Sequence, residues 1–313
     1  MIDGGKVGLI LTGPTASGKT KLSIDIALWL QSNGVRTCII NADSKQIYGD
    51  VPIITAQPTL VEKKGIEHAL FSFVNNKEAL LNRYSVDSWV KDCNNIVQNN
   101  IKQDIFTIIA GGTMFYINGL INPLTNLPKI DKEVEECAIN LYNNIGHDDF
   151  AKLVLRYSKD AKLDKQRLIR NYCFIKQHQQ PIEFFYNSQL KNDNTIYNDK
   201  FYQFVLNPPR ENVYQWCNNR FLDMTKQGVI EEVQKIIKEN DEISNAIYTT
   251  SGFKYIVKFL SNLISKEEMI EKSSQETRNY AKRQITWINN KLPKSFSIET
   301  DKNNIFNFFK KIC

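Results

Sequence analysis

The sequence has no closely spaced cysteines or histidines. Its six cysteines and three histidines are scattered over 313 residues, at Cys38, Cys93, Cys137, Cys173, Cys217, Cys313, His68, His147 and His178. Structural zinc sites and disulfide frameworks need such residues at short, regular spacings. We therefore expect no metal cage, no disulfide framework and no histidine-based nucleophile, and we interpret the cysteines as small buried hydrophobic residues.

Long apolar segments are also absent. No window approaches the roughly 20 apolar residues that a membrane-spanning helix needs. The first residues, Met-Ile-Asp-Gly-Gly-Lys-Val, are too polar for a signal peptide. With 42% hydrophobic and 24% charged residues, the composition is that of a globular protein with a full core. We expect a cytoplasmic protein with no membrane attachment.

An excess of acidic residues is missing too. The formal net charge is +6, which suits a polyanionic partner but is shared by many enzymes without one. The charge alone therefore leaves nucleic-acid binding open.

Short apolar runs alternate with helical periodicity in the first part of the chain. Buried strands are predicted at residues 7–11, 37–40 and 106–110, and helices at residues 19–30 and 86–101. This alternation predicts an α/β fold with a parallel sheet and right-handed crossovers.

The pattern changes near Pro123. Residues 131–188 show helical spacing and no strand, which predicts an all-helical insertion, and the polar, Asn-rich residues 191–198 suit a loop. Residues 201–206 then predict a last strand of the sheet. The remaining helices are predicted at residues 213–227, 230–238, 255–260 and 266–290. The predicted domains are an α/β core, residues 1–122 and 200–313, and a helical insertion, residues 123–199.

A glycine-rich motif follows the first predicted strand. Residues 13–20 read Gly-Pro-Thr-Ala-Ser-Gly-Lys-Thr, which matches the P-loop pattern G-x-x-x-x-G-K-[ST] between a strand and a helix. In such a loop, successive backbone N–H groups and the helix N-terminus surround a diphosphate. Lys19 adds a positive charge, and the Thr20 hydroxyl can bind Mg²⁺. The motif predicts a diphosphate site.

Asp43 follows the second predicted strand, within the run Asn-Ala-Asp-Ser-Lys-Gln-Ile-Tyr at residues 41–48. A carboxylate there lies at the ligand-binding edge of an open parallel sheet. It suits three roles, which are binding Mg²⁺ through water, acting as a general base, and capping the following turn. Gly111-Gly112-Thr113 lies at the same edge, where paired glycines allow either close approach to a ligand or a tight turn.

Two basic clusters lie on predicted helices. Arg167 and Arg170 are three residues apart and project from one helix face. The second cluster mixes basic and aromatic residues: Arg278, Tyr280, Lys282, Arg283 and Trp287. Both clusters suit a nucleic-acid backbone, and a solvated helix face explains each equally well.

Taken together, these segments resemble the tRNA dimethylallyltransferase family, whose bacterial members prenylate N6 of adenosine 37, next to the tRNA anticodon. The matching motifs occur in one order along the chain: residues 13–20, Asp43-Ser44-x-Gln46-Ile47-Tyr48, Gly111-Gly112-Thr113-x-x-Tyr116, Gln166-Arg167-x-x-Arg170, Arg220-Phe221-x-x-Met224 with Gly228 and Glu231-Glu232-Val233, and Thr277-Arg278-x-Tyr280-Ala281-Lys282-Arg283-Gln284-x-Thr286-Trp287.

The resemblance implies a P-loop α/β core with a helical insertion, and transfer of a dimethylallyl group from dimethylallyl diphosphate with release of diphosphate. Asp43 would be the general base, with Thr20 and Arg220 also catalytic. The implied diphosphate ligands are Gly13, Thr15, Ala16, Ser17, Gly18, Lys19, Thr20 and Thr113. The residues implied to touch tRNA are Asp43, Ser44, Lys45, Gln46, Gln166, Arg167, Leu168, Ile169, Arg170, Gly252, Phe253, Lys254, Arg278, Lys282 and Arg283. We expect a monomer that uses Mg²⁺, held partly by Thr20.

Three segments depart from the family pattern. Residues 53–58 read Ile-Ile-Thr-Ala-Gln-Pro where the family usually has Ile-Gly-Thr-Ala-Lys-Pro. Residues 178–181 read His-Gln-Gln-Pro in place of Thr-Gly-Lys-Pro, and residues 250–254 read Thr-Ser-Gly-Phe-Lys in place of Ala-Ile-Gly-Tyr-Lys. These departures weaken individual expected tRNA contacts, above all at residues 249–251, and leave the P-loop and Asp43 unchanged.

Two other functions compete with this one. A P-loop kinase would hold ATP in the loop and use Asp43 to activate a hydroxyl, but it usually needs an arginine-rich lid and leaves the second basic cluster unexplained. A nucleotide-dependent RNA-binding switch would need a second metal-organising aspartate after a strand. The strand at residues 106–110 ends in Gly-Gly-Thr instead.

Overall fold

The computed structural model describes residues 5–81, 84–122, 127–158, 164–187 and 196–312. The chain divides into two compact units. The larger unit comprises Met1–Asn122 and Asn194–Cys313, and the smaller one is Pro123–Asp193. Residues 196–199, which the sequence analysis assigned to the insertion, belong to the larger unit.

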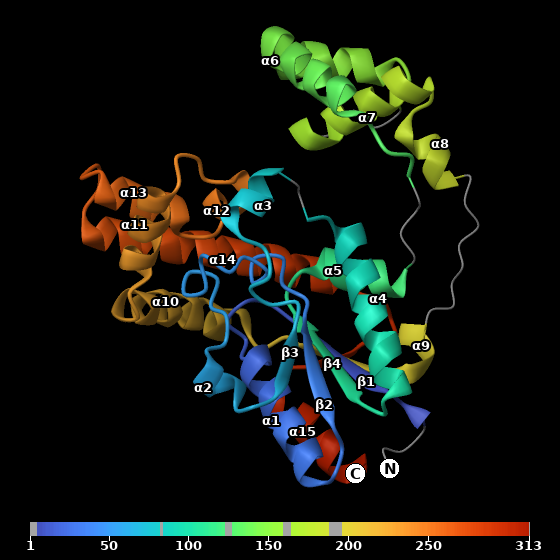
Figure 1. Cartoon of the computed structure of the whole chain (residues 1–313), viewed down its shortest axis with the longest axis vertical. Coiled ribbons are helices and arrows are strands. Elements are labelled where there is room, and N and C mark those ends of the chain that lie inside the picture. The colour runs from blue at the N-terminus through green and yellow to red at the C-terminus, as the bar shows by residue number, and fades with distance from the viewer. Residues whose placement is uncertain (1–4, 82–83, 123–126, 159–163, 188–195, 313) are drawn as a thin grey trace. The chain divides into compact units, whose positions relative to one another are not determined.

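The larger unit is built on a six-stranded, all-parallel sheet with the order β3-β2-β4-β1-β5-β6 (Figure 1). The strands are β1 (Gly8–Thr12), β2 (Thr37–Asn41), β3 (Glu67–Ala69), β4 (Phe106–Gly111), β5 (Phe201–Leu206) and β6 (Ser297–Glu299). The α/β class and the four predicted strands are confirmed. The prediction that Phe201–Leu206 is the last strand is wrong, because β6 pairs with it.

Alternate residues of β1 enter different cores, because successive side chains of a strand point to opposite faces. Leu9 and Leu11 pack with helices α1 (Lys19–Ser32) and α15 (Lys302–Ile312). Ile10 packs with α4 (Val86–Lys102) and α5 (Met114–Ile121). Figure 1 shows α1 and α15 together on one face of the sheet. With both faces covered, β1, β2 and β4 are buried along their whole length and mostly apolar, as expected for a parallel sheet.

Further helices pack beside the sheet in the same unit. They are α10 (Arg210–Lys226), α11 (Val229–Glu239), α12 (Asn245–Tyr248), α13 (Phe253–Leu260) and α14 (Lys266–Lys291), together with the short α2 (Leu60–Lys63) and α3 (Asn76–Leu81). Phe253 and Ile256 of α13 are fully buried in the core between these helices. The long helix α14 passes the carboxyl ends of β1 and β4, since Gln284 contacts the residues that follow them. It therefore borders the edge where ligands bind in such sheets.

The predicted loop at residues 191–198 is partly wrong. Residues 191–195 lie outside the described residues, but Ile196–Lys200 forms helix α9. The physical reason is the burial of Tyr197, whose ring packs on Phe201 and whose hydroxyl donates to Asn94 Oδ1 at 2.5 Å. This tertiary packing outweighs the polar composition of the segment.

The described residues of the smaller unit form helices and no strand, as predicted. It contains α6 (Lys132–Leu155), α7 (Lys165–His178) and α8 (Ile182–Asn187). Phe150 and Leu168 are central to its core. Gly146, at φ 80°, interrupts the helical geometry of α6. None of the described helices of either unit combines the length and the apolar character needed to cross a membrane.

Candidate active site

The glycine-rich loop joins β1 to α1 and is shaped by two glycines. A Cβ at Gly13, where φ is 149°, would lie 2.2 Å from the carbonyl oxygen of Leu206. Gly18 precedes α1 with φ 89°, a left-handed conformation that favours glycine. Lys19 folds back over the loop, with Nζ donating to Pro14 O at 2.6 Å and to Ser17 Oγ at 3.5 Å. The loop thus closes around its own lysine.

The pKa of Lys19 is changed by burial and by neighbouring charges. This pKa is lowered from 10.5 to about 8: burial lowers it most, the Asp43 carboxylate opposes this effect, and Arg220 adds to the lowering. The pKa of Arg220 is itself lowered by burial and raised by Asp43. Two cations and one carboxylate therefore lie near one another, half-buried, at the carboxyl edge of the sheet, which suits an anionic ligand.

Thr15 is held from two sides. Its backbone N–H donates to Gln284 Oε1 at 2.8 Å, and its hydroxyl oxygen accepts from Arg220 Nη1 at 2.9 Å. The backbone N–H that a P-loop could offer to a phosphate is already used here. Thr15 therefore stays a predicted diphosphate ligand only through its hydroxyl.

Asp43 sits in a turn built by Asn41. The Asn41 side chain accepts from the Asp43 N–H at 2.8 Å and donates to the Asp43 carbonyl at 2.9 Å. Asp43 Oδ1 accepts from the Lys45 N–H at 2.9 Å, so the capping role is observed. No described residue donates a hydrogen bond to Oδ2. This oxygen remains for a substrate, and the capping and base roles are compatible.

Thr113 ties the Asp43 turn to the end of β4. Its Oγ1 accepts from the Ser44 N–H at 2.9 Å and donates to Ser44 Oγ at 3.2 Å. Tyr280 of α14 borders the same place: burial raises its pKa, the Asp43 charge adds to this, and a hydrogen bond with Thr113 opposes it. Sequence reasoning placed Tyr280 only in a basic cluster and missed this position.

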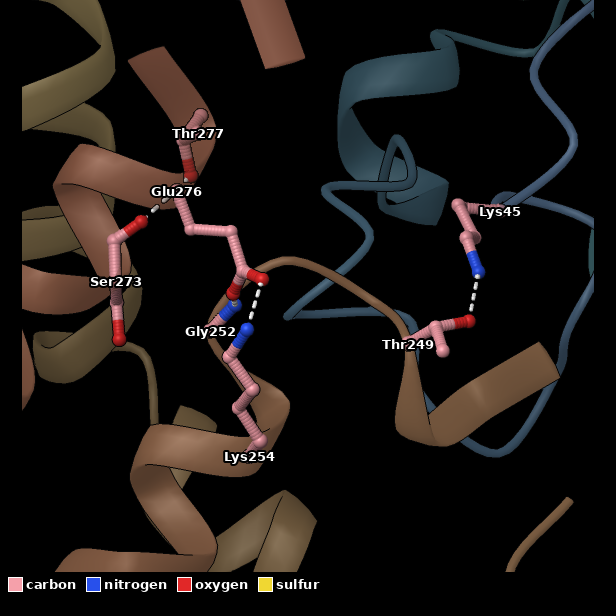
Figure 2. Close-up of polar contacts among 7 residues, drawn as sticks. All are labelled: Lys45, Thr249, Gly252, Lys254, Ser273, Glu276 and Thr277. Atoms are coloured by element: carbon pink, nitrogen blue, oxygen red, sulfur yellow. Dashed lines mark hydrogen bonds and ion pairs between the residues drawn. The ribbon is translucent and has the colours of Figure 1, made fainter. Parts of the chain in front are cut away.

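The side chains of Lys45 and Gln46, which were predicted to touch tRNA, form hydrogen bonds within the protein. Lys45 Nζ donates to the Ala246 carbonyl at 2.6 Å. It also donates to Thr249 Oγ1 at 3.1 Å (Figure 2). Gln46 is buried and donates to the carbonyls of Thr55 and Ala56. Both side chains therefore order the segments around Asp43.

Glu276 of α14 holds the turn before α13. Its carboxylate accepts from the Gly252 N–H at 2.9 Å and pairs with Lys254 Nζ at 2.6 Å (Figure 2). Figure 2 also shows the neighbouring Thr277 hydroxyl, which donates to the Ser273 carbonyl. Phe253 is fully buried, so its side chain cannot touch RNA. The structure thus gives this turn a packing role that the expected RNA contacts did not include.

The basic residues of α14 differ in exposure. Arg278 donates to Asn218 of α10, whereas Lys282 and Arg283 are exposed. These two line a surface hollow of about 390 Å³ with Asn279 and Thr286. This hollow offers two cations to an anionic partner.

On α7 of the smaller unit, Gln166, Arg167 and Arg170 are exposed. Leu168 and Ile169 are buried in the core of that unit, so the expected RNA contact of their side chains does not agree with the structure. They form the apolar face of α7, as the helical periodicity requires. Arg167 pairs with Asp164 at 3.6 Å, and no ion pair is found for Arg170 among the described residues.

Glu232 of α11 binds the loop that follows the Asp43 turn through two hydrogen bonds. Its two oxygens accept from the N–H groups of Ile53 and Ile54 at 2.7 and 2.9 Å. Burial raises its pKa from 4.5 to about 7, although these hydrogen bonds act in the opposite direction. Sequence reasoning matched Glu232 to the family without assigning it a role. The two hydrogen bonds of Glu232 hold the same loop whose Thr55 and Ala56 carbonyls accept from Gln46.

Replacing Glu232 with glutamine should change how stability depends on pH. Because the folded pKa lies above the unfolded one, the contribution of Glu232 is complete below pH 4.5 and is lost as the pH rises through about 7. The Tm of Glu232→Gln minus that of the wild type should therefore become more positive between about pH 5 and pH 8. Thermal melts across this range test it, and a constant difference would contradict it.

The chemistry of the donors decides how Mg²⁺ could be bound. No cluster of three or more metal-ligating side chains exists among the described residues. The hydroxyl of Thr20, in the first turn of α1, is the kind of single oxygen ligand that P-loops supply. Thr20 would therefore supply one protein oxygen to Mg²⁺, which would add positive charge beside the diphosphate loop.

Comparison with known proteins identifies the family of this chain. A model of the IPP transferase family matches residues 46–291. The tRNA dimethylallyltransferase of Ehrlichia ruminantium (strain Welgevonden) is 37% identical over 296 residues, covering 93% of this chain and 94% of that protein. The one from Wolbachia pipientis wMel is 36% identical over 298 residues, covering 93% and 95%.

Solved structures share the fold. The tRNA isopentenylpyrophosphate transferase of Bacillus halodurans has a TM-score of 0.66 at 23% identity, covering 98% of this chain and 96% of that chain. A eukaryotic dimethylallyltransferase described as acting on tRNA has a TM-score of 0.71 at 25% identity, covering 90% of this chain and 69% of that chain. The resemblance seen in the sequence motifs is thereby confirmed, and this chain belongs to the tRNA dimethylallyltransferase family of prenyl-transferring enzymes.

Proposed function

We propose that this enzyme transfers the dimethylallyl group of dimethylallyl diphosphate to N6 of adenosine 37, beside the anticodon of tRNA. The observation that carries the proposal is the convergence of Asp43, Lys19 and Arg220 at the carboxyl edge of the sheet, where each perturbs or is perturbed by the others. A base and two cations in one half-buried site suit a reaction that removes a proton and releases an anion.

Asp43 is proposed as the general base. The exocyclic amine of adenine is a weak nucleophile, because its lone pair is delocalised into the ring. As N6 bonds to C1 of the allyl group, the C1–O bond to diphosphate breaks and a proton of the amine passes to the carboxylate. Oδ1 is held by the Lys45 N–H, so we propose that Oδ2 receives this proton.

The leaving group is proposed to lie in the loop. Charge that accumulates on the departing diphosphate would meet the backbone N–H groups from Ala16 to Thr20, the Lys19 ammonium and the Arg220 guanidinium. Arg220 is oriented by Thr15 Oγ1 at 2.9 Å, which fixes its direction without neutralising it. Mg²⁺ bound at Thr20 would add positive charge to the diphosphate.

The tRNA is proposed to contact exposed cations on both units. Lys282 and Arg283 belong to the larger unit, and Arg167 and Arg170 to the smaller one. The target adenine has to leave its stack to reach a pocket of this kind, so a flipped base is expected. Because one chain supplies every residue of the site described above, we propose a monomeric enzyme.

Arg170→Gln should weaken tRNA binding about tenfold and reduce the slope of log K against log salt by about one, since one phosphate contact is lost. Filter binding over a salt series measures both quantities. Arg36→Gln is the matched control. Arg36 is exposed and precedes β2, so it lies at the amino ends of the strands and away from their carboxyl ends, where the site is. An unchanged salt slope in Arg170→Gln would remove this residue from the interface.

One transfer assay separates the proposed function from its alternatives. The protein is incubated with tRNA and either radiolabelled dimethylallyl diphosphate or γ-labelled ATP, and the tRNA is digested to nucleosides. We expect the prenyl label on N6 of adenosine and no movement of the phosphate label. Phosphate transfer would instead indicate a P-loop kinase, and tight RNA binding without either transfer would indicate a nucleotide-dependent switch.

A further inference from the structure

Gln284 is a buried polar residue that joins two segments of the site. It lies on α14 and is only 4% exposed. Its Oε1 accepts from the Thr15 N–H at 2.8 Å, and its Nε2 donates to the Gly112 carbonyl at 2.7 Å. These partners follow β1 and β4, so one side chain bridges the diphosphate loop and the Gly-Gly-Thr turn.

The Gln284 amide packs closely against Gly112. A Cβ on Gly112 would lie 2.5 Å from Gln284 Nε2 and 3.3 Å from the Gly13 carbonyl oxygen. The bridge needs one acceptor and one donor at the end of an unbranched side chain, and a neutral amide supplies both. A glycine at position 112 and a glutamine at position 284 are therefore matched to each other.

Gln284 belongs to a polar stripe along α14. Glu276, Tyr280 and Gln284 are spaced four residues apart, which places them on one face of a helix. Glu276 holds the Gly252 turn, and Tyr280 is hydrogen-bonded to Thr113. The stripe thus contacts, in order, the turn before α13, Thr113 beside the Asp43 turn, and the diphosphate loop.

We propose that Gln284 is a positioning residue for the transfer reaction. By fixing Thr15 to Gly112 it sets the spacing between the leaving-group loop and the Asp43 turn, which Thr113 holds directly after Gly112. The proposal rests on the function proposed above, because the two segments it aligns carry the diphosphate and the base. Gln284 touches neither substrate and acts through Thr15 and Gly112.

Gln284→Met tests this, since methionine is close in size and removes both hydrogen bonds. The loop would then sample other arrangements, so we expect the KM for dimethylallyl diphosphate to rise about tenfold and kcat to fall about tenfold. The KM for tRNA should stay within about twofold, because the exposed face of α14 is unchanged. Gln275→Met is the matched control, as Gln275 is exposed on the same helix.

Gly112→Ala approaches the same bridge from the other side. The added Cβ would displace the Gln284 amide, so its kinetic effect should resemble that of Gln284→Met. Because both changes break one bridge, the double variant should be hardly worse than either single variant. Additive effects of the two substitutions on kcat/KM would overturn the proposal.

A thermal melt and a titration with inorganic diphosphate separate a positioning role of Gln284 from a purely structural one. If Gln284→Met lowers Tm while kcat and KM per folded protein stay at wild-type values, the residue is structural only and the proposal is overturned. Titration with inorganic diphosphate needs no turnover, and we expect about tenfold weaker binding in the variant. If the wild type transfers no prenyl group, the function proposed above fails. The diphosphate titration still decides whether Gln284 orders the loop.

Discussion

Asp43→Asn should lower kcat roughly 10²-fold or more, the usual scale for the loss of a general base, and leave the affinity for dimethylallyl diphosphate nearly unchanged. Asparagine keeps the size of the side chain and an oxygen that can accept from the Lys45 N–H, so the turn around position 43 should persist. The proton of the adenine amine would have no acceptor. Single-turnover rates with saturating tRNA and diphosphate substrate measure this step directly.

The matched control is Asp241→Asn, which makes the same chemical change at an exposed position. It should behave like the wild type. A single-turnover rate of Asp43→Asn near the wild-type value would show that Asp43 is not the base. A loss of tRNA affinity at an unchanged rate would assign it to RNA positioning instead.

Local patterns in the sequence predicted the centre of the fold well. The strands at residues 7–11 and 106–110 are continuous apolar runs, because a parallel sheet buries both of their faces. Gly13 and Gly18 adopt the positive φ values that the turn at residues 13–20 requires. The motif therefore predicted this loop directly after β1. Such features depend on neighbours in the chain and can be read from them.

Elements that depend on distant partners were missed. Strands β3 and β6 have three residues each, none of them fully buried, so only pairing with β2 and β5 defines them. Helix α15 was missed although its buried residues Ile305 and Phe309 are four apart, a spacing that could have identified it.

The same distinction holds in the site. The P-loop and Asp43 were found from motifs, whereas the contacts that orient them come from far along the chain. Gln284 reaches Thr15 across 269 positions of sequence. Glu232 reaches Ile53 across 179. Matching the family named these residues, but their partners became visible only when the chain was folded.

Lys19→Met should lower kcat/KM for dimethylallyl diphosphate by about 10² to 10³-fold, the scale seen when one donor to a developing anion is removed. Methionine keeps the unbranched stem and loses the charge. The wild type should also show a pH effect that the variant lacks. The pKa of Lys19 is lowered to about 8 in the ligand-free protein, and a bound diphosphate favours the charged form.

Affinity should therefore be full below pH 8 and fall as the pH rises through that value, by about tenfold between pH 7 and pH 9. The neighbouring Cys217 does not interfere, because burial raises its pKa to about 11. Titration calorimetry with dimethylallyl diphosphate measures the profile. Lys21→Met, an exposed lysine on the same helix, should keep the wild-type pH dependence. A profile in Lys19→Met that still falls through pH 8 would assign the titration to another group.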